Sequence, residues 1–314
     1  MKSLINQKIN SSRLKVQLLI KNEFETDSSL KLERNQKRKY YLKKMVLNPK
    51  KTMSYLTGKV FCIDYVEIVL TTVCTLNCKG CSALMSYYKK PYHITLKKNI
   101  NALRKLISLC DTVEHLRLLG GEPLCYPELY DVLSFIDTQE KIKKVTIVTN
   151  GTLLINNQKI IELLKKRKFN IYISNYGKVS RKKEELIEIL SENNINYTVK
   201  EDFLWRDYGN LINRNRKNKK LKKQYLNCKI MCTSILDGKL HHCPRSSHGM
   251  NLKIIPLNNR DYVNLLDDNT SSEQLRKRLY KFFYGYIPYI EACNYCNSGT
   301  KLLKTIKAGI QYKK

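Results

Sequence analysis

The amino-acid sequence predicts an α/β fold built on parallel strands, followed by a small cysteine-rich region. Short β-branched and apolar runs alternate with helical patterns over residues 65 to about 200. Strand followed by helix, repeated, gives parallel strands joined by right-handed crossovers. The chain has 314 residues, enough for one sizeable core and a smaller second one. Most of its eleven cysteines fall in two groups, one inside the alternating region and one after it.

Five runs are expected to form strands: 66–70, 115–119, 144–149, 170–174 and 196–200. Helices are expected between them, where apolar residues recur at steps of three and four, as at Ile100, Leu103 and Ile107. In a barrel of parallel strands, the loops that follow the strands share one rim, where active sites lie. Residues that follow different strands are therefore expected to lie close together in space.

The first cysteine group follows the first expected strand. Cys74, Cys78 and Cys81 stand in a C-x3-C-x2-C spacing. Thiolate ligands select iron-sulfur clusters or zinc, and a 4Fe-4S cluster normally takes four of them. Three ligands would leave one iron open to a substrate or cofactor, as the open position does in a catalytic zinc site. On the spacing alone, a zinc knuckle or buried structural cysteines remain alternatives.

This spacing resembles that of the radical S-adenosylmethionine (SAM) enzymes, and other stretches agree. Residues 116–123 resemble the family's "GGEP" element, 145–151 resemble its "TNG" strand end, and 171–175 resemble its ribose-facing strand. The resemblance implies a partial (β/α)6 TIM-like barrel, in which the GGEP element holds the methionine amino group of SAM. The residues that it assigns to SAM binding are Gly120, Gly121, Glu122, Asn150, Ser174 and Asn175. In one departure, Gly80 stands where the family usually has an aromatic residue.

In the second cysteine group, Gly238 and Cys243 stand in a G-x4-C spacing, with Cys228 upstream and the pair Cys293 and Cys296 downstream. This pattern resembles the Twitch domain, a shortened relative of the SPASM domain. Asp237-Gly238 lies between apolar runs, which predicts a β-hairpin. The resemblance implies one auxiliary 4Fe-4S cluster, and zinc in the same site is the alternative. The favoured ligands are Cys228, Cys243, Cys293 and Cys296, with Cys232 as the substitute.

The expected domains are a basic N-terminal extension (1–60), the radical SAM barrel (61–226), the auxiliary region (227–300) and a basic tail (301–314). No apolar run is long enough for a transmembrane helix, and the first residues do not resemble a secretory signal. An odd number of cysteines favours metal ligation in a reducing compartment. The expected location is the cytoplasm.

The formal net charge of +31 raises the possibility of nucleic-acid binding. The excess lysine accompanies abundant asparagine, isoleucine and tyrosine, which indicates a compositional bias and favours solvated lysines over a nucleic-acid surface. Residues 214–223 form a dense basic tract. It is interpreted as a solvated linker or helix face, and a contact for substrate phosphate is the alternative.

The expected function is a radical SAM oxidoreductase that acts on a carbohydrate or another polar small molecule. Its cluster arrangement resembles that of the Twitch-bearing aminocyclitol dehydrogenase of butirosin biosynthesis. A hydroxyl proton would need a base, with Glu201 and Asp207 as the first candidates and Tyr176 and His242 as further ones. The expected partners are the substrate and an electron donor such as flavodoxin or ferredoxin. The alternatives are a peptide-modifying maturase and a nucleic-acid-binding iron-sulfur protein.

Overall fold

The structure, a computed structural model, describes residues 60–201, 204–228, 230, 232–284 and 287–312. The predicted N-terminal extension lies outside the described residues, except for Val60. Among the described residues, no helix combines the length and apolarity that crossing a membrane requires.

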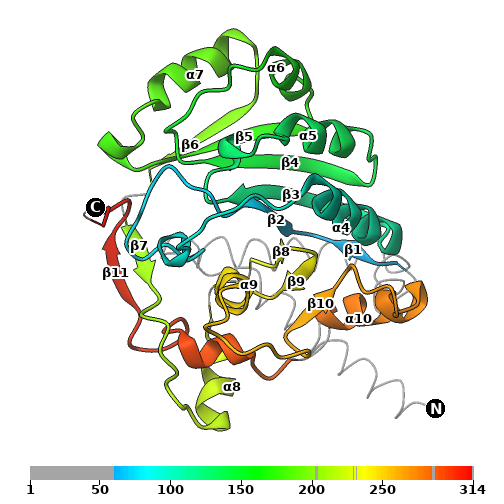
Figure 1. Ribbon diagram of the computed structural model, residues 1–314, viewed down its shortest axis with the longest axis vertical. Coiled ribbons are helices and arrows are strands. Elements are labelled where there is room, and N and C mark those ends of the chain that lie inside the picture. Colours follow the sequence, from blue (N-terminus) through cyan, green and yellow to red (C-terminus); the bar gives the residue numbers. More distant parts are fainter. Residues whose placement is uncertain (1–59, 202–203, 229, 231, 285–286, 313–314) are drawn as a thin grey trace, which may run out of the picture.

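One large sheet forms the centre of the described structure (Figure 1). Its parallel part comprises β2 (Val66–Thr71), β3 (Thr112–Gly120), β4 (Ile142–Thr149), β5 (Phe169–Asn175) and β6 (Tyr197–Glu201). The five predicted strands correspond to these elements, which confirms the α/β class and the mostly parallel sheet. The short strand β1 (Cys62–Ile63) pairs in parallel with β3.

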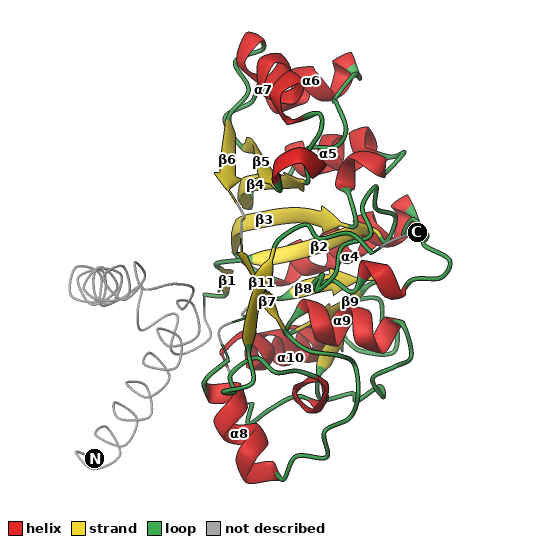
Figure 2. Ribbon diagram, turned by 90° about the vertical axis from the view of Figure 1, so that its left-hand side faces the viewer, coloured by secondary structure: helices red, strands yellow, loops and turns green. Residues whose placement is uncertain are grey.

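Helices connect the parallel strands and cover one face of the sheet (Figures 1 and 2). They are α4 (Leu96–Leu109), α5 (Leu129–Asp137), α6 (Gln158–Leu164) and α7 (Lys183–Glu192). Each has an apolar side that is buried, as Leu103 and Leu106 are in α4 and Val132 and Ile136 are in α5. The core therefore lies between these helices and the sheet, and the strand ends remain available for a site.

The cysteine-rich region extends the same sheet beyond β2. Strand β8 (Ser234–Leu236) pairs in parallel with β2, and β9 (Lys239–His241) and β10 (Tyr262–Asn264) continue the sheet in antiparallel fashion. The predicted hairpin is β8–β9, with Asp237 and Gly238 both at positive φ, as a tight two-residue turn requires. This pairing brings the second cysteine group beside the first strand of the barrel.

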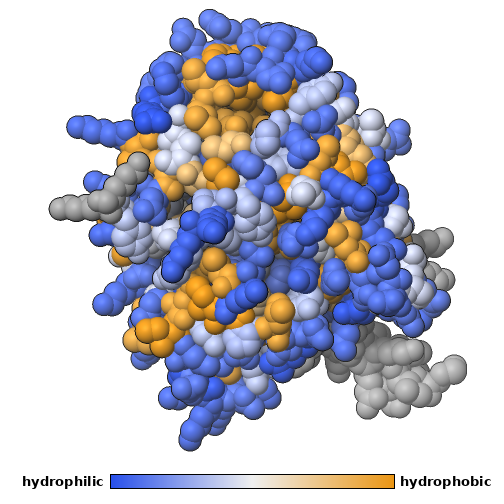
Figure 3. Space-filling model, in the orientation of Figure 1, coloured by the Kyte–Doolittle hydropathy of each residue, from blue (hydrophilic) through white to orange (hydrophobic). Residues whose placement is uncertain are grey.

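The C-terminal half contains the helices α8 (Asn218–Leu226), α9 (Pro244–Asn251) and α10 (Ser272–Tyr284). The 3-10 turns among the described residues are η1 (Met85–Tyr87), η2 (Pro123–Cys125), η3 (Gly177–Val179) and η4 (Glu291–Tyr295). Strands β7 (Leu204–Asp207) and β11 (Lys304–Lys307) form a separate antiparallel pair. Hydrophilic residues dominate the outline of the face seen in Figure 3, and apolar residues gather in smaller patches between them.

Candidate functional site

A cavity of about 310 Å³ lies at the carboxyl ends of the parallel strands. Its lining brings together residues that follow four different strands, as the sequence predicts. The predicted site residues in the lining are Cys74, Cys78, Cys81, Gly120, Gly121, Asn150 and Ser174. The order of the strands, and not proximity in the chain, therefore assembles this site.

In the first cysteine group, Cys78 is buried, Cys74 and Cys81 are half-buried, and the thiols receive hydrogen bonds. Cys74 Sγ accepts from the backbone N–H of Leu76 at 3.5 Å and from Asn150 Nδ2 at 3.7 Å. Burial raises the pKa of Cys74 to about 12 and that of Cys78 to about 11, and it also raises the pKa of Cys81. A thiolate here needs a bound cation, and three soft sulfurs on one cavity fit an iron-sulfur cluster.

Two glycines let the end of β3 lie directly on the cysteine loop. A Cβ atom on Gly120 would lie 2.6 Å from the carbonyl oxygen of Thr71, and one on Gly121 would lie 2.2 Å from that of Val73. The Gly121 N–H donates to Thr71 O at 2.9 Å. This cavity wall is therefore made of backbone, which fits the close approach of a ligand such as SAM.

Glu122 is fully buried and lies behind the cavity rather than in its lining. Its carboxylate accepts from the backbone N–H groups of Leu124 at 3.0 Å and Asn150 at 2.8 Å. Burial raises the pKa of Glu122 to about 7 against the effect of these donors. In this structure, Glu122 joins the GGEP element to the end of β4.

Three further predicted residues lie outside the cavity lining. Asn175 Nδ2 donates to both carboxylate oxygens of Glu201 at 2.7 Å, and Glu201 is exposed on the edge strand β6. Asp207 Oδ1 accepts from the Gly209 N–H at 2.8 Å. The structure therefore brings the predicted SAM-binding residues Asn150 and Ser174 into the cavity, but it leaves both candidate bases outside the lining.

Sequence reasoning missed a buried carboxyl group that does line the cavity. Glu67 on β2 is 3% exposed, and the Tyr65 hydroxyl donates to one of its oxygens. Arg117 Nη1 donates in turn to the Tyr65 hydroxyl at 3.2 Å. The second oxygen, Oε2, has no hydrogen bond of normal geometry from the described residues. Burial raises the pKa of Glu67, and Arg117 and the Cys232 thiol partly offset this effect. The sequence feature that could have identified Glu67 is a single acidic residue within an apolar strand.

The second cysteine group forms its own small cavity of about 30 Å³. Its lining contains Cys228, Cys243, Cys293 and Cys296, the favoured set, whereas Cys232 lines the large cavity. Cys243 Sγ accepts from Ser246 N at 3.4 Å, and Cys296 Sγ accepts from Ser298 N at 3.3 Å. Four soft sulfurs, two of which accept hydrogen bonds from backbone N–H groups, fit a closed cluster. Among the described residues, no His, Cys, Asp or Glu group is arranged to hold a single metal ion.

Part of the basic tract positions this second site. Arg216 Nη1 donates to the carbonyl oxygens of Cys293 at 3.0 Å and Cys296 at 2.6 Å. Gln224 Nε2 donates to the same two oxygens at 2.9 and 3.0 Å. Arg214 similarly donates to the carbonyl oxygen of Asn294. These arginines therefore hold the cysteine-bearing turn through its backbone.

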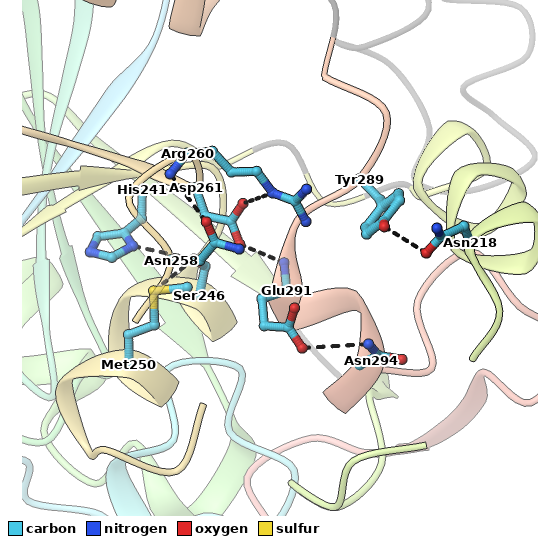
Figure 4. A network of polar contacts seen from close by, with 10 residues as sticks. All are labelled: Asn218, His241, Ser246, Met250, Asn258, Arg260, Asp261, Tyr289, Glu291 and Asn294. Atoms are coloured by element: carbon cyan, nitrogen blue, oxygen red, sulfur yellow. Dashed lines mark hydrogen bonds and ion pairs between the residues drawn. The ribbon is translucent and has the colours of Figure 1, made fainter. Parts of the chain in front are cut away.

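A buried carboxylate fixes the start of η4, which carries Cys293 (Figure 4). Asp261 is 0% exposed and accepts from the backbone N–H of Glu291 at 2.5 Å and from Arg260 Nε at 3.3 Å. Burial raises the pKa of Asp261. In the same view, Tyr289 donates to Asn218 at 2.7 Å on the surface.

Gly121→Ala is expected to destabilise the protein by several kcal/mol, because its Cβ would meet backbone atoms that cannot move without displacing the cysteine loop. Gly177→Ala is the control, since nothing lies within 4 Å of its Cβ and only its positive φ of 67° opposes the change. That strain costs about 1–2 kcal/mol. Urea unfolding measures the stability of both variants. Equal losses of stability would contradict the close contact between Gly121 and the cysteine loop.

Asp261→Ala is expected to destabilise the protein by about 1–3 kcal/mol, because it leaves the buried N–H of Glu291 unpaired. Asn218→Ala removes a surface hydrogen bond instead and is expected to change stability by less than about 0.5 kcal/mol. Chemical denaturation compares the two variants. An Asp261→Ala protein as stable as Asn218→Ala would show that this carboxylate does not hold η4.

Comparisons with known proteins agree with this geometry. Residues 68–175 match the family described as the Radical SAM superfamily. A GTP 3',8-cyclase from Alkaliphilus oremlandii is 30% identical over 94 residues, which are 29% of this chain and 29% of that protein. Another from Clostridium perfringens is 27% identical over 172 residues, 50% of this chain and 53% of that protein. The chain thus matches about half or less of the length of these curated relatives.

A solved structure shares the fold over a larger part of the chain. The crystal structure of BtrN in complex with AdoMet and 2-DOIA superposes with a TM-score of 0.50 at 15% identity. The match covers 75% of this chain and 93% of that one. At this identity the likeness concerns the fold alone. Residues 68–175, about a third of the chain, are therefore similar to the Radical SAM superfamily.

Proposed function

We propose that this protein is a radical SAM enzyme that binds a 4Fe-4S cluster at Cys74, Cys78 and Cys81 and oxidises or modifies a carbohydrate or another polar small molecule. The observation that carries the proposal is the shared cavity. Three cysteine thiols, the backbone of Gly120 and Gly121, and the ends of β4 and β5 all line it. When bound, the cluster would supply the electron that cleaves SAM to a radical able to take a hydrogen atom from the substrate.

The chain itself positions and encloses these groups. Cys74 is held by Asn150, whose Nδ2 also donates to Thr75 Oγ1 at 3.2 Å, so the end of β4 fixes the cysteine loop. Glycine at positions 120 and 121 lets the end of β3 pack directly on the cysteine loop. Cys78 is buried, which limits the access of water to a cluster and to a reactive radical.

The cavity lining also contains polar side chains, which favours a polar substrate. They include Glu67, Arg206 and Tyr208, and the buried Arg206 Nη1 has no hydrogen-bond acceptor among the described residues. These groups can bind hydroxyl, amino or carboxylate groups of a small molecule. Because Glu67 faces the cavity and its pKa is raised, it is better placed to accept a hydroxyl proton than Glu201 or Asp207.

The second cysteine group supports an auxiliary cluster of the Twitch type. In oxidation of a carbinol carbon, a hydrogen atom leaves to the SAM-derived radical and the hydroxyl proton leaves to a base. One electron then remains to be removed, and a closed auxiliary cluster is the proposed acceptor. An external donor such as flavodoxin or ferredoxin would reduce the first cluster.

Nucleic-acid binding has less support from the geometry. Two arginines of the basic tract, Arg214 and Arg216, donate to backbone carbonyls inside the protein. A phosphate group would have to displace those contacts. Modification of a peptide remains an alternative substrate class for the same chemistry.

Cys78→Ala is expected to abolish release of deoxyadenosine from SAM by reconstituted, reduced protein, because it removes one of three proposed ligands. Cys125→Ala is the control, because Cys125 is outside the lining of either cysteine-bearing cavity. Chromatography of the reaction mixture measures the product. Cleavage that persists in Cys78→Ala, or that the unmodified protein never shows, would overturn the proposal.

Anaerobically reconstituted protein is expected to contain about eight iron and eight sulfide per chain, because each cube holds four of each. Cys293→Ala should lower both to about four. Cys232→Ala should leave them unchanged, because Cys232 lies in the other cavity. About four of each together with one zinc would contradict the auxiliary cluster. Iron and zinc are measured by elemental analysis.

A further inference from the structure

We propose that the C-terminal segment 304–312 is part of the cofactor site, and that Gln311 is a positioning residue for the sulfur of Cys78. The proposal rests on the proposed function, because Cys78 is taken as a cluster ligand. From the sequence alone, this segment is predicted only to be part of a basic tail. In the structure it reaches the first cysteine loop, more than 230 positions earlier in the chain.

The nitrogen and the oxygen of the Gln311 side-chain amide both form hydrogen bonds with the cysteine loop. Gln311 Nε2 donates to Cys78 Sγ at 3.0 Å, and Gln311 Oε1 accepts from the backbone N–H of Asn77 at 2.7 Å. A second donation from Nε2 to Gly309 O at 2.7 Å fixes the orientation of the amide. The side chain therefore holds the sulfur and the backbone before it at the same time.

Backbone pairing reinforces this contact on either side. The Lys79 N–H donates to Ile310 O at 2.7 Å, and the Tyr312 N–H donates to Asn77 O at 2.8 Å. Together they form an antiparallel bridge between Cys78 and Gln311. A β-bridge to a metal-ligand loop restricts that loop as strand pairing does within a sheet.

The same segment fills the space above Gly80, the position where the family usually carries an aromatic side chain. A Cβ atom on Gly80 would lie 2.4 Å from Ile306 Cδ1. Ile306 belongs to β11 and is paired with Trp205 of β7. Trp205 packs edge-on against Tyr176, and both rings line the large cavity. Strand β11 thus supports a wall of the cofactor cavity from outside the barrel.

The hydrogen bond has a direct electrostatic consequence. An N–H group that points at a thiolate sulfur stabilises its negative charge, and the reduced cluster carries more negative charge than the oxidised one. Cys78 is 6% exposed, so water cannot easily replace the donor. Gln311 is therefore expected to raise the reduction potential of a cluster bound at Cys78.

The potential is tested with Gln311→Leu, which removes the donor and keeps a similar volume. Its first cluster should have a lower midpoint potential than that of the unaltered protein in a redox titration followed by electron paramagnetic resonance. Lys307→Ala is the control, because Lys307 is exposed on the same segment. An unchanged or higher potential in Gln311→Leu would overturn the role of Gln311.

The docking of the segment is tested without any cluster, in the full-length metal-free protein. Ile306→Asp places a charge against Gly80 and should speed alkylation of Cys78 by iodoacetamide about tenfold or more, because the segment opens locally. Lys307→Asp places an aspartate on the opposite face of β11 and should leave the rate unchanged. Mass spectrometry of the Cys78 peptide measures the rate of alkylation.

The outcomes separate this proposal from the proposed function. Equal alkylation in the two aspartate variants would overturn the docking even if SAM is cleaved normally. Faster alkylation in Ile306→Asp would support the docking even if the protein were to bind no cluster. If Ile306→Asp speeds alkylation and the protein binds no cluster, the docking of the segment stands and only the proposed function is wrong.

Discussion

Parallel pairing of consecutive strands is the constraint on which the site depends. Because β2, β3, β4 and β5 run in one direction, the loops after them meet at a single rim. Hydrogen bonds then connect these loops directly to one another. The backbone of Gly121 contacts the carbonyl of Thr71, and Asn150 contacts Cys74. Any side chain at Gly121 would separate the two loops that carry the thiols and the glycine wall.

The second cysteine group is tied to the first through the same sheet. Strand β8 pairs with β2, so the chain that leads to Cys243 starts beside Glu67. Tyr208 lines the large cavity, and the thiols of Cys228 and Cys296 are near enough to affect its pKa, which burial raises and Arg206 lowers. A substrate in the cavity would thus lie on the side of the auxiliary site. This arrangement suits removal of an electron from the substrate to a second cluster.

Local patterns predict a large part of this structure. The strands were identifiable from short β-branched runs. The structure places Cys228, Cys243, Cys293 and Cys296 in one cavity, and their role as ligands, favoured over Cys232 from the family resemblance, stays a prediction. Contacts between distant segments were not predictable. No local pattern links Gln311 to Cys78, and the charge of Arg216 does not indicate whether it contacts solvent or a backbone carbonyl. The role of Glu67 was hardly predictable, because the function of an acidic residue in an apolar strand depends on neighbours that the sequence does not reveal.

The proposed open coordination position at the three-cysteine loop is tested most directly by electron paramagnetic resonance of the reduced, anaerobically reconstituted protein. Adding SAM should change the signal of one cluster, because the methionine amino and carboxylate groups would bind its free iron. The signal of a cluster with four protein ligands should stay the same. A spectrum that SAM leaves wholly unaltered would show that no open iron exists at Cys74, Cys78 and Cys81.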